Sequence, residues 1–265
     1  MRVVCQQPNY IPWLGYFEQI ARADAFVYLD NVQWIRQGRQ HRARVPFQTA
    51  PAKERLERDP HAAFAKNYLT VPVHGHGHRE RSIRDMEIDH SRAWHSSHWG
   101  VLKALYGKAP EFKSQLEPLF RPFLEQANQH KYLIDLCEAS VALFWKPLEL
   151  KAQVWHATDL EPEGVKSERL LHICQTLEAT EYYAALGASR YLELPLFRGA
   201  NIQVRWQNFR KSPLDISRPC DLSILDWVAH HKWEDIRAAI GPARGSIPEA
   251  ASFGEGSINR VVSPV

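Results

Sequence analysis

The stretch from Cys5 to Val45, CQQPNYIPWLGYFEQIARADAFVYLDNVQWIRQGRQHRARV, constrains the fold more than any other part of the chain. The β-branched pair Val3–Val4 just before it is typical of a buried strand, and the spacing of apolar residues over 14–23 predicts a helix. A second apolar run at 25–29 predicts another strand. A strand, a loop, a helix and a strand within about 30 residues predict one βαβ unit.

The rest of the chain continues this alternation of strands and helices. It predicts an α/β fold with three layers and a mainly parallel, Rossmann-like sheet, in which residues 91–145 form a helical segment. We expect one domain over residues 1–240 and a loosely held tail over 241–265, which are rich in Gly, Pro, Ser and Ala. The polar, proline-punctuated residues 48–68 are expected to form a surface insertion or flap, and residues 83–88 a strand.

The loop after the first strand carries amide and aromatic side chains. Open α/β folds bind ligands at the carboxyl ends of their strands, so this loop is a candidate binding site. Amides and aromatic rings hydrogen-bond and stack without charge, which suits a sugar, a nucleobase or an amide. The alternative for Trp13 and Tyr16 is a place in the core. The candidate ligand-binding residues of this segment are Gln7, Asn9, Tyr10, Trp13 and Tyr16.

The loop after the second strand should lie beside the first, because both follow neighbouring parallel strands. It places Asp30, Gln33 and Trp34 next to the same cleft. Asp30 is the carboxylate of these two loops and is therefore the candidate catalytic base, although an acid in this place also caps a turn.

Arg42 and Arg44 follow in a run with strand periodicity, which places both guanidinium groups on one face. Such a pair suits a phosphate or a carboxylate, and the alternative is a solvated basic strand. Ser189 and Arg190 lie in a turn of small residues between a predicted strand and a helix. This turn is either a ligand loop or simply a tight turn.

Other signals exclude classes of function more than they assign one. His74, His76 and His78 alternate with glycine beside Arg79 and Arg81, and we interpret them as a surface loop rather than a metal site. A net charge of +3 argues against nucleic acid as a partner. No apolar run reaches the roughly 18 residues of a membrane span. The four cysteines are far apart, which is typical of reduced thiols in the cytoplasm.

Several segments resemble the WbqC-like family, bacterial proteins found among polysaccharide and O-antigen biosynthesis genes. The specific part is QPNYIPWLGYFEQIARADAFVYLDNVQW, and the resemblance continues at residues 87–89, 106–110, 166–170, 187–192 and 222–226. It covers roughly residues 2 to 230. The resemblance implies a role near surface-sugar assembly.

A second resemblance concerns the fold. A strand, a proline-containing loop and an H-x-G-H helix start mark nucleotidyltransferases, in which the two histidines contact nucleotide phosphates. This chain has Trp13-Leu14-Gly15-Tyr16 there, so the glycine is kept and both histidines are replaced by aromatic residues. A nucleotidyltransferase-like fold is therefore compatible with the sequence, whereas the phosphate chemistry lacks its imidazoles.

These observations lead to three hypotheses. The first is a transferase, or a related enzyme, that acts on an activated sugar or amino-sugar in polysaccharide assembly, with a sugar or nucleotide-sugar as its ligand. The second is an adenylating or nucleotidyl-transferring enzyme, and the third is a non-catalytic component of a sugar-assembly complex. The sequence requires no cofactor, although it is compatible with a nucleotide as cofactor. It is also compatible with a homo-oligomer.

Overall fold

The computed structural model describes residues 1–48, 57, 59, 61, 64–75, 81–209, 214–215 and 218–241. Its strands are β1 (Arg2–Gln6), β2 (Ala25–Tyr28), β3 (Arg42–Gln48), β4 (Phe64–Thr70), β5 (Gln153–His156), β6 (Glu181–Ala184) and β7 (Gln203–Trp206). His76, His78 and the expected tail from residue 242 onward lie outside the described residues.

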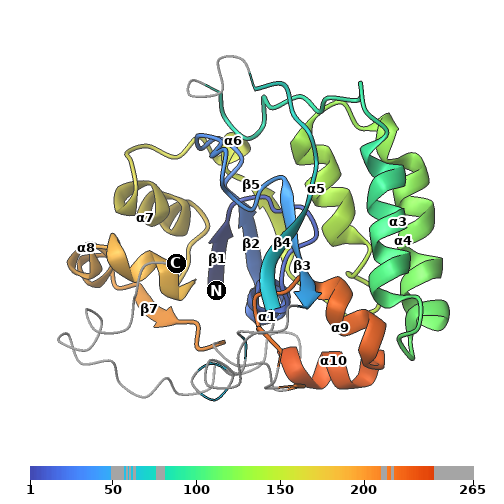
Figure 1. The fold of residues 1–265 in the computed structure, drawn as a ribbon. Coiled ribbons are helices and arrows are strands. Elements are labelled where there is room, and N and C mark those ends of the chain that lie inside the picture. The colour runs from blue at the N-terminus through green and yellow to red at the C-terminus, as the bar shows by residue number, and fades with distance from the viewer. Residues whose placement is uncertain are drawn as a thin grey trace.

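The helices make up most of the rest (Figure 1). The α-helices are α1 (Leu14–Arg22), α3 (Trp94–Tyr106), α4 (Glu117–Gln126), α5 (Leu133–Ala142), α6 (Ala157–Leu160), α7 (Ser167–Thr176), α8 (Leu194–Gly199), α9 (Ile224–His230) and α10 (Trp233–Ile240). Shorter turns of helix are η2 (Phe112–Leu116), η3 (Ala127–Gln129) and η4 (Leu186–Arg190). In the described part of the chain, no helix combines the length and apolar character needed to cross a membrane.

A five-stranded sheet with the order β5-β2-β1-β6-β7 forms the centre of the molecule, and every pairing in it is parallel. β1 pairs with β2 from Val3 opposite Ala25 to Gln6 opposite Tyr28, with α1 between them in the chain. The predicted βαβ unit and the α/β class are therefore confirmed. The strand order reverses between β1 and β6, as in doubly wound folds.

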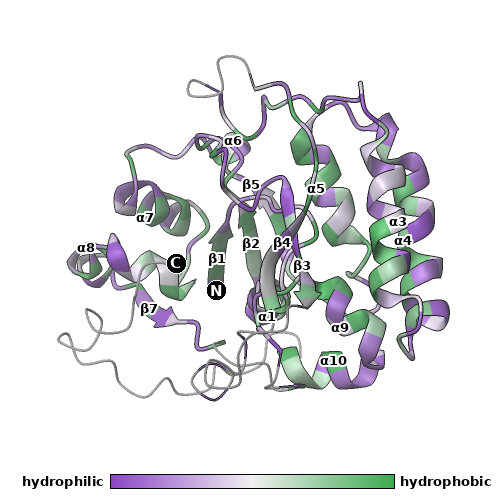
Figure 2. Ribbon diagram, viewed as in Figure 1, coloured by the Kyte–Doolittle hydropathy of each residue, from purple (hydrophilic) through white to green (hydrophobic). Residues whose placement is uncertain are grey.

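Alternation along the central strands builds two cores, one on each face of the sheet. Val3, Cys5 and Val27 pack with α7 and α8 on one face. Val4 and Phe26 pack on the other face with α1 and with the helices that lie to the right in Figure 1. Figure 2 shows the hydrophobic colour concentrated on β1 and β2, while the helices around them carry both colours. The layers arise because the central strands β1 and β2 are buried on both faces.

A separate hairpin lies in front of the sheet in Figure 1. β3 and β4 pair antiparallel, with Arg42 opposite Thr70 and Arg44 opposite Tyr68. The strand predicted around Arg42 and Arg44 is confirmed, but the flap predicted over residues 48–68 is wrong for residues 64–68, which belong to β4. These residues pair with β3 in an antiparallel ladder, so a partner strand distant in the sequence, and not the local pattern, defines this strand.

The strand predicted over residues 83–88 is also wrong. This segment makes only isolated bridges, Ile88 with Val73 and Glu87 with Tyr132. Its apolar residues Ile83, Met86 and Ile88 are buried in the core. The spacing of apolar residues therefore predicted correctly that this segment is buried, but it did not predict whether the segment pairs as a strand.

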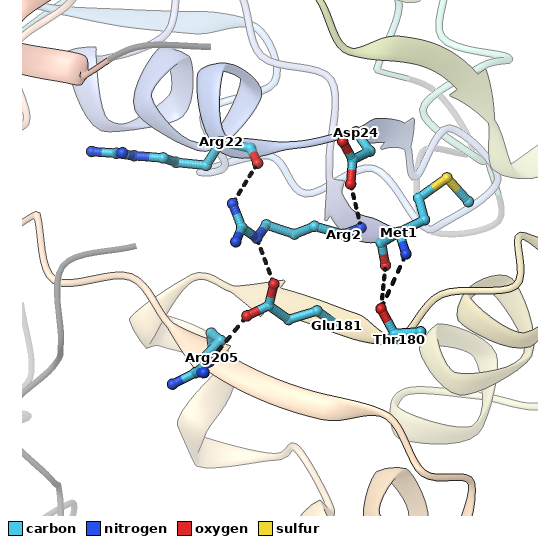
Figure 3. A network of polar contacts seen from close by, with 7 residues as sticks. All are labelled: Met1, Arg2, Arg22, Asp24, Thr180, Glu181 and Arg205. Carbon is cyan, nitrogen blue, oxygen red and sulfur yellow. Dashed lines mark hydrogen bonds and ion pairs between the residues drawn. The ribbon is translucent and has the colours of Figure 1, made fainter. Parts of the chain in front are cut away.

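The amino-terminal edge of the sheet is held by a polar network (Figure 3). Arg2 Nε donates to Glu181 Oε2 at 2.8 Å, and Arg205 Nε donates to Glu181 Oε1 at 3.0 Å. The backbone N–H of Arg2 donates to Asp24 at 2.7 Å. These contacts join the starts of β1, β2 and β6 to β7, so they fix the order and register of the strands.

Candidate functional site

A cavity of about 540 Å³ opens at the carboxyl end of β5, between this edge of the sheet and α5. Its charged and ionisable lining consists of Arg84, Asp85, Asp135, Glu138, His156 and Asp159, with Tyr132 and Ile134 beside them. The volume is in the range of small-molecule sites. Four carboxylates against one guanidinium make the cavity acidic, so it favours a cationic solute.

Glu138 and His156 form a close pair in this cavity. His156 Nε2 lies 2.7 Å from Glu138 Oε1, and the imidazole stacks on Tyr28 with ring centroids 5.7 Å apart. When Nε2 carries the proton that Glu138 accepts, Nδ1 keeps a lone pair, 3.8 Å from Asp159 Oδ2. A carboxylate that orients an imidazole in this way is the arrangement needed for general acid–base chemistry.

The local structure explains why these side chains meet. Asp135 and Glu138 are three residues apart on α5 and therefore share one face of the helix. His156 is the last residue of β5, the edge strand beside β2. Burial raises the pKa of Glu138, an effect that His156 opposes and that Asp135 and Asp30 reinforce. Burial also raises the pKa of Tyr28, as does the charge of Glu138.

Asp30, the residue predicted to be a base, is fully buried. It accepts hydrogen bonds from the Thr158 backbone N–H at 3.0 Å and from Thr158 Oγ1 at 2.8 Å. It also accepts one from Arg84 at 3.0 Å. These contacts attach β2 to the start of α6 and to one wall of the cavity. The role of the Asp30 carboxylate is therefore to position Thr158 and Arg84.

The lining does not form a metal centre. Among the described residues, no three His, Cys, Asp or Glu side chains are grouped as metal ligands. The cavity nevertheless supplies donors and acceptors for a polar organic molecule: carboxylate oxygens, a guanidinium, an imidazole and the hydroxyl group of Tyr132.

The residues predicted in the first loop divide between the core and a polar contact near the start of β3. Gln7 Oε1 accepts from Gln40 Nε2 at 2.6 Å, which joins the first loop to the residues just before β3. Tyr10 and Tyr16 are buried, and their hydroxyl groups contact His98 Nδ1 at 3.1 Å and the Gln7 carbonyl at 3.1 Å. Asn9 is partly exposed in the same loop.

Trp13 lies flat against the first turn of α1. A Cβ atom added at Gly15 would lie 2.2 Å from the Trp13 ring, and Phe209 packs edge-on at 5.8 Å. The glycine retained from the H-x-G-H pattern therefore makes room for the indole. Trp13 is therefore partly buried and packs against the edge of the core.

Gln33 and Trp34 of the second loop, and the predicted pair Arg42 and Arg44, contact residues outside the first loop. Trp34 is buried against His41, with ring centroids 5.0 Å apart, and Gln33 forms a bridge with Ser82. Arg44 is ion-paired with Asp221, which Arg39 also contacts at 2.8 Å. Arg42 donates to the Gly38 carbonyl at 3.2 Å and lies over the Tyr68 ring at 4.8 Å. Among the described residues, no hydrogen bond or ring contact joins Trp13, Asp30 and Arg42 to one another.

Ser189 and Arg190 lie in η4, which follows β6 at the point where the strand order reverses. Ser189 Oγ is buried, with no hydrogen-bond partner in the described part of the chain, and Arg190 is exposed. Gln6 and Gln19 lie on the β1 side of the same point and are joined at 2.6 Å. The two predicted residues therefore lie at the sheet edge where they were expected, away from the His156–Glu138 pair.

Sequence reasoning missed His156 and Glu138. The signals were present: Asp135 and Glu138 have helical spacing, and His156 ends an extended run. The pairing itself is tertiary, because β5 reaches this place only by joining β2 at the edge of the sheet.

Comparison with known proteins gives one family and a distant relative. The model of the WbqC-like protein family matches residues 7–238. An uncharacterized protein of Mycobacterium tuberculosis (strain ATCC 25618 / H37Rv), Rv1507c, is 29% identical over 208 residues, which is 78% of this chain and 82% of the relative. No solved structure matches.

Proposed function

The chain belongs to the WbqC-like protein family, and from that premise we propose that it is an enzyme acting on the amino group of an amino-sugar in polysaccharide assembly. The observation that carries the proposal is the 2.7 Å contact between His156 and Glu138 inside an acidic cavity at the carboxyl edge of β5. The surface-sugar role implied by the sequence resemblance supplies the substrate class.

The chemistry follows from the charges of the cavity. An ammonium group is attracted by Asp85, Asp135 and Asp159, whereas a phosphate would be repelled by them. His156 Nδ1 then accepts a proton from the ammonium group, which gives a neutral amine with a free nitrogen lone pair. Glu138 and Asp159 stabilise the resulting imidazolium. When the sugar is activated by a nucleotide, its phosphates lie outside this acidic lining.

The cellular place proposed is the cytoplasm, where activated sugars are available. The four cysteines are free thiols and three of them are buried, which supports a reducing compartment. Burial raises the pKa of Cys5 and Cys137, so these thiols are unreactive packing residues.

The test compares glucosamine with glucose, which differ in the amine alone, by titration calorimetry at neutral pH. We expect glucosamine to bind at least about tenfold more tightly than glucose. Glu138→Gln and Asp135→Asn should each remove most of this preference. Equal affinity for the two sugars, or binding of neither, would reject the proposal.

Glu125→Gln is the matched control for Glu138→Gln. Glu125 is an exposed glutamate on α4 whose ion-pair partner is Arg121, so its neutralisation should leave the preference unchanged. A comparable loss in both variants would show that net charge, and not the cavity, selects the amine.

A further inference from the structure

A second cavity, of about 450 Å³, continues from the acidic one. The two cavities share Asp135 and Glu138 in their linings. Away from these carboxylates the second cavity is lined by Tyr28, Ala139, Val141, Ala142, Trp145 and Val154. It is therefore an apolar annex that begins where the acidic lining ends.

The polarity changes in the same direction along both walls. On the helical wall, α5 presents Glu138 to both cavities and, one turn later, Ala142 to the annex alone. On the strand wall, His156 lines the acidic cavity and Val154, two residues earlier on the same face of β5, lines the annex. One continuous cleft therefore runs from charged to apolar.

We propose that the annex holds an uncharged alkyl or acyl group of the same substrate whose amine lies in the acidic cavity. This inference rests on the proposed function and specifies its substrate class further, as an amine-bearing sugar that carries an apolar substituent or receives one. Val154 is 41% exposed and Trp145 is partly exposed, so apolar surface is open here for a ligand to cover.

The experiment titrates the protein with a series of straight-chain primary amines from methylamine to n-hexylamine, with glucosamine in parallel. Transfer of a methylene from water to an apolar site favours binding by up to about fourfold. We therefore expect affinity to rise with each added methylene until the annex is full.

Two variants separate the annex from a general preference for longer amines. Trp145→Ala removes the largest ring of the annex, and Val154→Thr replaces a methyl by a hydroxyl with little change of shape. Both should reduce the gain per methylene while leaving methylamine affinity within about twofold. Val165→Thr is the control, because Val165 is also an exposed valine but lies before α7, outside both linings.

The outcomes are distinguishable. If amines bind with an affinity that is independent of chain length, the annex inference is overturned and the proposed function stands. A gain per methylene that survives in both annex variants overturns the inference as well. If neither glucosamine nor any alkylamine binds, the proposed function fails and the annex inference falls with it.

Discussion

The two edges of the parallel sheet are built from similar residues but organised in opposite ways. At the amino edge, Glu181 lies between Arg2 and Arg205, and each of these charged side chains has an ion-pair partner (Figure 3). At the carboxyl edge, carboxylates outnumber cations around an open cavity. Matched charges fix strand order, whereas unmatched charges beside a cavity are free to act on a solute.

The largest effect is expected at Asp30, where a substitution tests whether the carboxylate stabilises the fold or acts on a solute. Asp30→Ala should lower the free energy of unfolding by about 3 kcal/mol, because the Thr158 N–H loses a charged acceptor and α6 loses its attachment to β2. Urea unfolding at neutral pH measures this loss. Unchanged stability with abolished activity would instead identify Asp30 as the catalytic base.

The region around the carboxyl ends of the strands should also lose more stability at acid pH. Burial lowers the pKa of His98 to about 4, so the folded protein keeps this imidazole neutral between Tyr10 and Thr70. The unfolded chain takes up the proton below its ordinary pKa of about 6.5, so this stability is complete above that pH and is lost as the pH falls toward 4. Between pH 7 and pH 5 the loss is about 2 kcal/mol.

His98→Gln tests the acid sensitivity. Urea unfolding at pH 7 and pH 5 should show a difference between the two pH values that is smaller in this variant than in the native chain by roughly 2 kcal/mol. His41, whose pKa burial also lowers to about 4, contributes in the same direction and remains in both proteins. An identical pH dependence in the two proteins would contradict the assignment.

The smallest effects belong to the amino edge. Glu181→Ala removes the partner of Arg2 and Arg205 and should destabilise the fold by about 1–2 kcal/mol, since Arg2 is partly buried. Arg205→Ala should cost less than about 1 kcal/mol, because that side chain is 46% exposed. Neither variant should alter the preference for glucosamine, and a change in that preference would show that the two edges are coupled.

The sequence by itself determined the central βαβ unit and the α/β class. Apolar residues at strand and helix spacing in the first 30 positions specify which groups are buried, and burial of both strand faces requires layers of helices.

The tertiary structure decided which side chains share a cavity. The aromatic residues Tyr10, Trp13 and Tyr16 suggest ligand contacts in the sequence, whereas in the structure Tyr10 and Tyr16 are buried in the core and Trp13 packs against it, partly buried. The local signals of His156 and Glu138 are those of a strand end and a helix face, and neither signal predicts that the two residues meet. Their 2.7 Å contact exists only because β5 pairs with β2 while α5 packs alongside, and no pattern of residue spacing encodes that juxtaposition.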